Sequence, residues 1–105
     1  MFDKINLNDL GKTFEEIQKK AKEIQEESEN KIFIAKSGGG VVKVSVNGKG
    51  EVIDIEIDDS LLEDKESLSI LLISAINDAL KMTEEEKRRA AMDLINPTNL
   101  FGQQE

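Results

Sequence analysis

One stretch, residues 37–59 with the sequence SGGGVVKVSVNGKGEVIDIEIDD, constrains the fold more than any other part of the chain. Apolar and polar residues alternate along it on both sides of the glycine-rich sequence Asn47-Gly48-Lys49-Gly50. The alternating apolar positions are Val42, Val44 and Val46 before that sequence and Ile53, Ile55 and Ile57 after it. A period of two in β-branched residues, interrupted by turn formers, predicts a β-hairpin.

The alternation also predicts how the two strands pair. Pairing Val46 with Glu51 places the apolar side chains of both strands on one face of the hairpin. It sets Lys43 opposite Asp54 on the other face, where opposite charges stabilise the pairing. The apolar face needs a cover, and helical patterns lie on both sides of the hairpin in the sequence.

Ahead of the hairpin, the sequence predicts a helix and a short strand. From residue 7 to residue 24 the apolar side chains recur at steps of three and four, which is the narrow seam of paired helices. These positions are Leu7, Leu10, Phe14, Ile17, Ala21 and Ile24. The helix is expected to fray near residues 29–30. The sequence KIFIAK at residues 31–36 predicts a strand with apolar residues on both faces, which completes a three-stranded antiparallel sheet.

After the hairpin, a long helix is predicted at residues 65–94. Its N-cap is either Ser60, through a capping box with Glu63, or Asp64. Residues 68–80 are apolar nearly all around the helix, and such a segment is buried on more than one side. Because the hairpin covers one flank only, a second copy of the chain is expected on the other. Residues 83–89, TEEEKRR, predict a helical arm with no core beneath it, and Asn96-Pro97 ends the helix.

These elements predict one α+β domain at residues 1–95, with the order α-β-β-β-α, and a flexible tail at residues 96–105. The absence of histidine and cysteine removes the commonest general base and rules out disulfides and thiolate metal ligands. Asp54, Glu56 and Asp58 alternate as a solvated strand face, because no loop encloses a cation there. The Gly38-Gly39-Gly40 run is a strand connector and not a phosphate cradle, since a strand follows it. We therefore expect no enzyme activity, metal or cofactor.

The chain carries a net charge of −8, which repels nucleic acids and anionic lipids from the molecule as a whole. Its first ten residues lack the apolar segment of a signal peptide. No apolar run reaches the roughly 18 residues that a membrane span requires. A cytoplasmic protein without a membrane partner is expected.

Two local clusters of basic residues stand out against this negative charge. They are Lys19, Lys20 and Lys22 in the first helix and Lys87, Arg88 and Arg89 in the second. Both clusters are interleaved with glutamates, so the residues alone leave two alternatives open. Each cluster is either a solvated, salt-bridged helix face or a surface that contacts phosphates.

Several short motifs also follow one another in a recognisable order and spacing. They are Gly38-x-Gly40-Val41-Val42, Asn47-Gly48, Ile55-Glu56-Ile57-Asp58, Leu61-Leu62, Asp64-x-Glu66-x-Leu68 and Ala75-x-Asn77-Asp78-Ala79. In this order they resemble the YbaB/EbfC family of small bacterial nucleoid-associated proteins, over most of the chain. The resemblance implies a tight homodimer of α-β-β-β-α protomers whose helical arms grip DNA.

We therefore predict a homodimer that binds double-stranded DNA in the nucleoid through the six basic residues of the two clusters. Binding is expected to be weak and steeply salt-dependent, because few phosphates are neutralised. The alternative is an acidic dimeric adaptor that binds another protein and has little or no affinity for DNA. Basic residues gathered on one surface favour the first function, and evenly mixed charges favour the second.

Overall fold

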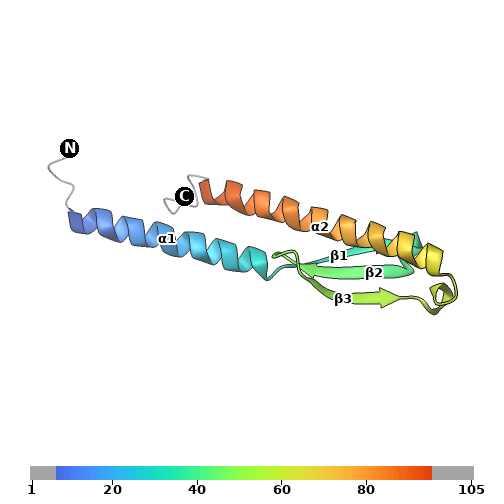
Figure 1. The fold of residues 1–105 in the computed structure, drawn as a ribbon. Helices are drawn as coiled ribbons and strands as arrows, with labels where there is room; N and C mark the ends of the chain where they lie inside the picture. Colours follow the sequence, from blue (N-terminus) through green and yellow to red (C-terminus); the bar gives the residue numbers. More distant parts are fainter. Residues whose placement is uncertain (1–6, 96–105) are drawn as a thin grey trace.

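The computed structural model of the chain describes residues 7–95, and its elements follow the predicted order (Figure 1). They are α1 (Leu7–Glu29), β1 (Ile32–Ser37), β2 (Val42–Asn47), β3 (Val52–Ile57) and α2 (Lys65–Ile95), with 3₁₀ turns at Gly38–Gly40 and Asp59–Leu61. The α+β class and the α-β-β-β-α order are confirmed. The tail predicted at residues 96–105 lies outside the described residues, as do residues 1–6.

The strands form an antiparallel sheet in the order β1-β2-β3, but the predicted hairpin register is wrong. Lys43 pairs with Glu56, two residues further along β3 than the alternation suggested. The turn is closed by a hydrogen bond between Asn47 and Glu51, where the alternation had paired Val46 with Glu51, and this moves the register by one residue. The loop between them has three residues and ends in Gly50, which has a φ of 86°. A β-bulge opposite the end of β2 adds the second residue of the shift. Beyond the bulge the total shift is two residues, so Ile55 and Ile57 stay on the apolar face, whereas Val52, opposite Val46, takes the place on that face predicted for Ile53.

The core lies between the sheet and α2. The three valines of β2 are fully buried, and Ala35 of β1 and Ala75 and Ala79 of α2 pack against them. Helix α2 crosses β1 and β2, whereas β3 lies beyond the edge of the helix. Val52 and Ile55 of β3 consequently keep 44% and 41% of their surface exposed.

Helix α2 is capped by Asp64, the second of the two predicted N-caps. Its carboxylate Oδ1 accepts a hydrogen bond from the Ser67 N–H at 3.1 Å, and hydrogen bonding to Ser67 lowers the pKa of Asp64. Ser60 lies instead in the preceding 3₁₀ turn, where its N–H donates to the carboxylate of Asp58 at 3.0 Å. The predicted capping box from Ser60 to Glu63 is therefore wrong.

The outer part of the molecule is an arm of two antiparallel helices. Helix α1 extends away from the sheet and the C-terminal part of α2 runs beside it, so the molecule is 75 Å long and 19 × 18 Å across (Figure 1). We define the arm as α1 together with residues 84–95 of α2. The expectation that residues 83–89 have no core beneath them is wrong at Thr83 and Glu86, which are both buried. They lie where α2 passes the end of α1 and the hairpin turn.

Candidate nucleic-acid interface

The arm is joined to the sheet where the β2–β3 turn meets the end of α1. The Gly48 N–H donates a hydrogen bond to the carbonyl oxygen of Glu29 at 3.1 Å. A Cβ atom at Gly48 would lie 1.8 Å from the carbonyl oxygen of Ser28, so only glycine allows the turn to approach α1 this closely. Asn47 braces the turn, because its Oδ1 accepts a hydrogen bond from the Lys49 N–H at 2.9 Å. The backbone of Lys49 is therefore fixed beside the base of the arm.

A buried carboxylate connects the two helices at the same junction. The Glu86 side chain is 5% exposed, and its Oε2 lies 2.7 Å from Nη2 of Arg89 and 3.3 Å from Nζ of Lys31. Hydrogen bonds from Arg89 lower the pKa of Glu86 to about 2, although burial opposes the change. Ser28 and Lys31 lower it further. Glu86 is therefore fully ionised near neutral pH. Its ion pair holds Lys31, which lies between α1 and β1, against α2.

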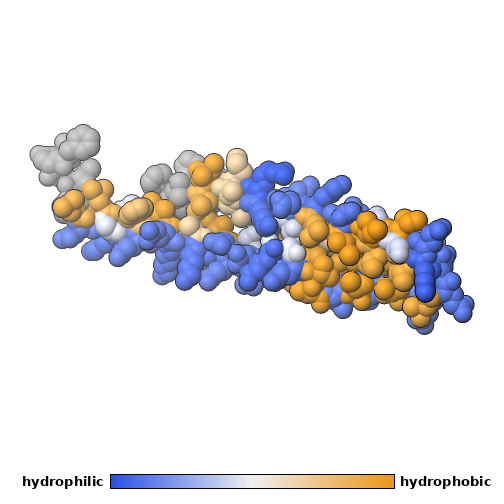
Figure 2. All heavy atoms as spheres, in the orientation of Figure 1, coloured by the Kyte–Doolittle hydropathy of each residue, from blue (hydrophilic) through white to orange (hydrophobic). Residues whose placement is uncertain are grey.

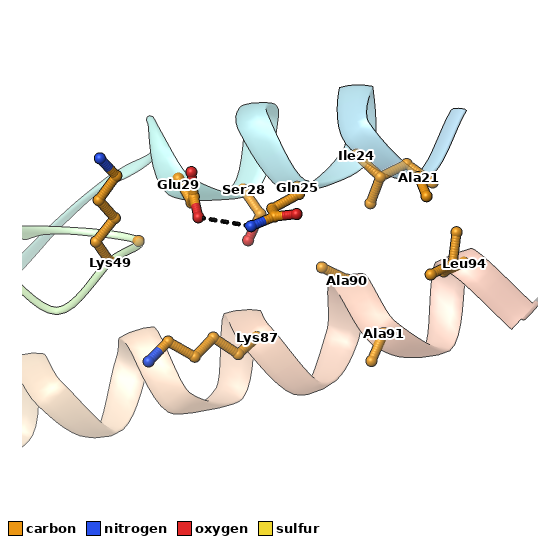
Figure 3. Close-up of a pocket in the computed structure, with 11 residues that line it drawn as sticks. Ala21, Ile24, Gln25, Ser28, Glu29, Lys49, Lys87, Ala90, Ala91 and Leu94 are labelled. Atoms are coloured by element: carbon orange, nitrogen blue, oxygen red, sulfur yellow. Dashed lines mark hydrogen bonds between the residues drawn. The ribbon is translucent and has the colours of Figure 1, made fainter. Parts of the chain in front are cut away.

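A groove of about 430 Å³ lies between α1 and α2, on the outer side of this junction (Figure 3). Its apolar lining comes from Ala21, Ile24, Ala90, Ala91 and Leu94, and α1 adds the polar side chains of Gln25, Ser28 and Glu29. Two lysines, Lys49 from the hairpin turn and Lys87 from α2, line the end of the groove nearest the sheet. Lys49 was not among the predicted site residues, because nothing in the sequence shows that the turn meets the arm.

The predicted basic residues of α1 are all exposed, but they are not level with the cluster on α2. They are Lys19, Lys20 and Lys22. Ala21 and Leu94 lie across the groove from one another, and Ser28 lies across from Lys87 (Figure 3). With a rise of 1.5 Å per residue, the α1 lysines lie about 10 Å further out along the arm than Lys87. The structure therefore distributes the two clusters along the arm.

The basic residues of α2 differ in how available their charges are. Arg88 is exposed and forms no ion pair with any residue between 7 and 95. The Nζ atom of Lys87 lies 3.6 Å from a carboxylate oxygen of Glu84, and an exposed pair of this kind holds its cation weakly. Lys49, like Arg88, is exposed and has no ion-pair partner within the described range.

Arg89, the third predicted residue of α2, is bound within the protein. Its guanidinium donates to both carboxylate oxygens of Glu86 and forms a further ion pair with Asp93. The hydrogen bonds to Glu86 are the main cause that raises the pKa of Arg89 above its already high value, and Asp93 raises it further. A phosphate contact by Arg89 would have to compete with both ion pairs.

The two flanks of α2 in the arm carry different charges. Arg89 lies with Phe33 of β1 around a shallow hollow that Glu85 and Glu86 also line, and we call this side the β1 flank. Lys87 lies about 160° away around the helix and lines the groove, on what we call the groove flank. Both flanks therefore carry mixed charges: Glu85, Glu86 and Arg89 lie on the β1 flank, and Lys87 lies on the groove flank with Glu84 and Glu29 nearby.

A broad apolar surface covers the sheet end of the molecule between β3 and α2 (Figure 2). It includes Val52 and Ile55 of β3 and Ile73 of α2, which is 60% exposed. Helical steps of three and four residues place Ile76 and Leu80 on the same flank of α2 as Ile73. The predicted excess of apolar surface on α2, beyond what its own sheet covers, is therefore present in the single chain. We call this surface the apolar flank.

The opposite face of the sheet is largely polar. Asp54 and Glu56 are exposed there, and Lys43 lies opposite Glu56 across the β2–β3 pair. Ile32 and Ile34 of β1 are also exposed on this face, as expected of a strand that is apolar on both sides. Between residues 7 and 95, no group of three acidic side chains is placed to hold a metal ion. No helix in this range is long and apolar enough to cross a membrane.

The fold and the arm define a small, elongated α+β protein built from a three-stranded sheet and two long helices. The chain belongs to the YbaB/EbfC DNA-binding family, whose model matches residues 3–97. The resemblance seen in the sequence is thereby confirmed.

Relatives and a solved structure agree with this assignment. A nucleoid-associated protein of a Nitratiruptor species is 71% identical over 103 residues, which are 98% of this chain and 99% of that protein. A nucleoid-associated protein of a Sulfurovum species is 56% identical over 102 residues, 97% and 99% of the two chains. The crystal structure of the uncharacterized protein HP0035 from Helicobacter pylori has a TM-score of 0.75 at 41% identity, covering 88% of this chain and 99% of that one.

Proposed function

We propose that the chain acts as a homodimer that binds double-stranded DNA in the bacterial nucleoid, through basic side chains of its two arms. The observation that carries the proposal is the match of residues 3–97 to a DNA-binding family. The side chains proposed to contact phosphates are Lys19, Lys20 and Lys22 of α1 and Lys87, Arg88 and Arg89 of α2. The proposed role is binding without catalysis and without a cofactor.

The negative charge of the molecule is compatible with this function because electrostatic fields are local. At physiological salt, charges further apart than about 8 Å are largely screened from one another. In the arm, Arg88 has no ion pair with any residue between 7 and 95 and the α1 lysines are exposed, so these cations can reach a phosphate although glutamates lie on the same helices. Contacts to the phosphate backbone of DNA do not distinguish one base sequence from another, so binding is expected to be largely independent of the DNA sequence.

The apolar flank supports the homodimer. Burying exposed apolar surface contributes about 25 cal/mol per Å², and Ile73, Val52 and Ile55 lie together on one side of the molecule. A second copy that presents the same flank is self-complementary, as a two-fold interface requires. Two arms would then extend from one central body.

Salt-dependent binding of a labelled DNA duplex tests the function. The variant Lys87→Gln/Arg88→Gln removes two arm charges and leaves Arg89 in the Glu86 junction. Its control, Lys43→Gln/Lys65→Gln, removes two charges from the outer sheet face and from the start of α2. We expect the arm variant to bind at least about tenfold more weakly and its salt slope to fall by about 0.9 for each phosphate no longer neutralised, while the control binds like the parent.

Two outcomes would contradict the proposal. Equal losses of affinity in the arm variant and the control would mean that net charge, and not the arm, governs binding. A parent protein without affinity for DNA even at low salt would favour the acidic adaptor. The same assay with Lys19→Gln/Lys20→Gln/Lys22→Gln shows whether the lysines of α1 take part.

A further inference from the structure

The hairpin turn brings a lysine to the arm that belongs to neither arm helix. Lys49 is exposed at the end of the groove, across the gap from Lys87 of α2, and its side chain is directed away from α2 (Figure 3). Its backbone is held by the hydrogen bond to Asn47, and the preceding residue, Gly48, is bonded to the end of α1. A cation on a fixed backbone loses less conformational freedom on binding than one on a loose loop.

The charges around Lys49 differ from those on the other side of α2. On the β1 flank, Lys31 and Arg89 are both paired with Glu86, and Arg89 also pairs with Asp93, so two carboxylates offset the two cations. On the groove flank, Lys49 has no ion pair with any residue from 7 to 95, and Lys87 has only the exposed pair with Glu84. Glu29, a carboxylate that lines the groove, accepts a hydrogen bond from Gln25 at 3.0 Å. The cations of the groove flank are therefore held less tightly than those of the β1 flank, although the carboxylates of Glu29 and Glu84 lie near them.

The groove flank also continues the apolar flank along α2. Steps of three and four residues lead from Ile73 through Ile76 and Leu80 to Lys87. A second copy seated on the apolar flank would therefore border the groove. In the proposed dimer, the groove flanks of the two copies lie on adjoining surfaces, and Lys49 and Lys87 are present twice.

We propose that DNA approaches the arm from the groove flank and that Lys49, together with Lys87, contacts its backbone phosphates. The contact surface then extends from the arm helices onto the end of the sheet. This inference rests on the proposed DNA-binding function, and it adds a binding residue and a direction of approach.

Single substitutions test the role of Lys49. Lys49→Gln is expected to weaken duplex binding several-fold and to lower the salt slope by about 0.9 for each phosphate that it no longer neutralises, as Lys87→Gln does. Lys43→Gln, a lysine of the same sheet on its outer face, is the control and is expected to leave both quantities unchanged. The melting temperature of all three variants should equal that of the parent, because these side chains reach solvent.

Two neighbouring glutamates test the direction of approach. Glu84 pairs with Lys87 on the groove flank, and Glu85 lines the hollow on the β1 flank. Glu84→Gln is expected to tighten DNA binding more than Glu85→Gln does. A Lys49→Gln variant with parental affinity and slope, or equal effects at the two glutamates, would overturn the inference. If the parent does not bind at low salt, the proposed function fails first, so the two failures are distinguishable.

Discussion

Glu86 and Arg89 face each other across one turn of α2, with Nε to Oε1 at 3.0 Å and Nη2 to Oε2 at 2.7 Å. A two-point contact of this kind fixes the guanidinium plane as well as its distance. The same carboxylate holds Lys31, so the pair also fixes the start of β1 against α2. The sequence groups Arg89 with the exposed cations Lys87 and Arg88, but its main contacts are with Glu86, in the junction that positions the arm.

We expect Glu86→Gln to destabilise the fold by about 2 kcal/mol, because it removes a buried charge while its two cationic partners remain. Arg89 and Lys31 are about half exposed, which limits the loss. Urea denaturation at one fixed protein concentration measures the difference. Glu85→Gln, an exposed change at the next residue, is the control, and an equal effect of the two substitutions would show that Glu86 is not structurally special.

The stabilising effect of Glu86 should also appear in the pH dependence of the free energy of unfolding. The pKa of Glu86 is about 2 in the folded protein, below its ordinary value near 4.5 in the unfolded chain. Its stabilising contribution is therefore complete above about pH 4.5 and is lost as the pH falls towards 2. Asp58 and Asp64 also have lowered pKa values and add to the acid loss. The difference between parent and Glu86→Gln isolates the Glu86 part, which should shrink towards zero across this window.

Gly48→Ala tests the close approach of the turn to α1. The added methyl group would overlap a backbone carbonyl of α1, which cannot rotate away, so we expect a loss of roughly 3 kcal/mol. Gly50→Ala is the matched control, because its Cβ would have no heavy atom nearer than 3.9 Å and only its φ of 86° is unfavourable. A loss of about 1 kcal/mol is expected there. Thermal or urea unfolding of the two variants gives the comparison, and equal losses would contradict a tight junction.

The periodic parts of the fold could be predicted from the sequence because each depends on local pattern. The steps of three and four in α1, and the alternation in β2 and β3, gave the right elements with nearly the right ends. The hairpin register could not be predicted by alternation alone, since a shift of two residues keeps Ile55 and Ile57 on the apolar face. It depended on Gly50 and on a bulge, which leave no periodic signal.

For the candidate site, the sequence predicted the basic residues of α2 but not how they are arranged in space. The sequence identified Lys87, Arg88 and Arg89 as one cluster, yet helical geometry separates them onto different sides of α2. Lys49 joins the arm only because Gly48 touches the end of α1, a contact between residues far apart along the chain. The burial of Glu86 has the same origin, and its neighbours in the sequence are all polar.

The proposed homodimer can be tested separately from DNA binding, on the apolar flank. Ile73 is 60% exposed in the single chain, so Ile73→Asp should leave the protomer folded. In a dimer closed over this flank it would bury an unpaired carboxylate and cost several kcal/mol of association free energy. Ile76→Asp is less informative, because Ile76 also packs on the core of its own chain.

Sedimentation velocity at micromolar concentration measures the outcome. We expect a dimeric parent and a folded, monomeric Ile73→Asp variant. Ile34→Asp places the same charge at a similarly exposed position on the opposite face of the sheet, and it should remain dimeric. Dissociation by Ile34→Asp but not by Ile73→Asp would move the interface to the outer face. A parent that sediments as a monomer would leave each arm to bind DNA alone, and the apolar flank would then need another partner.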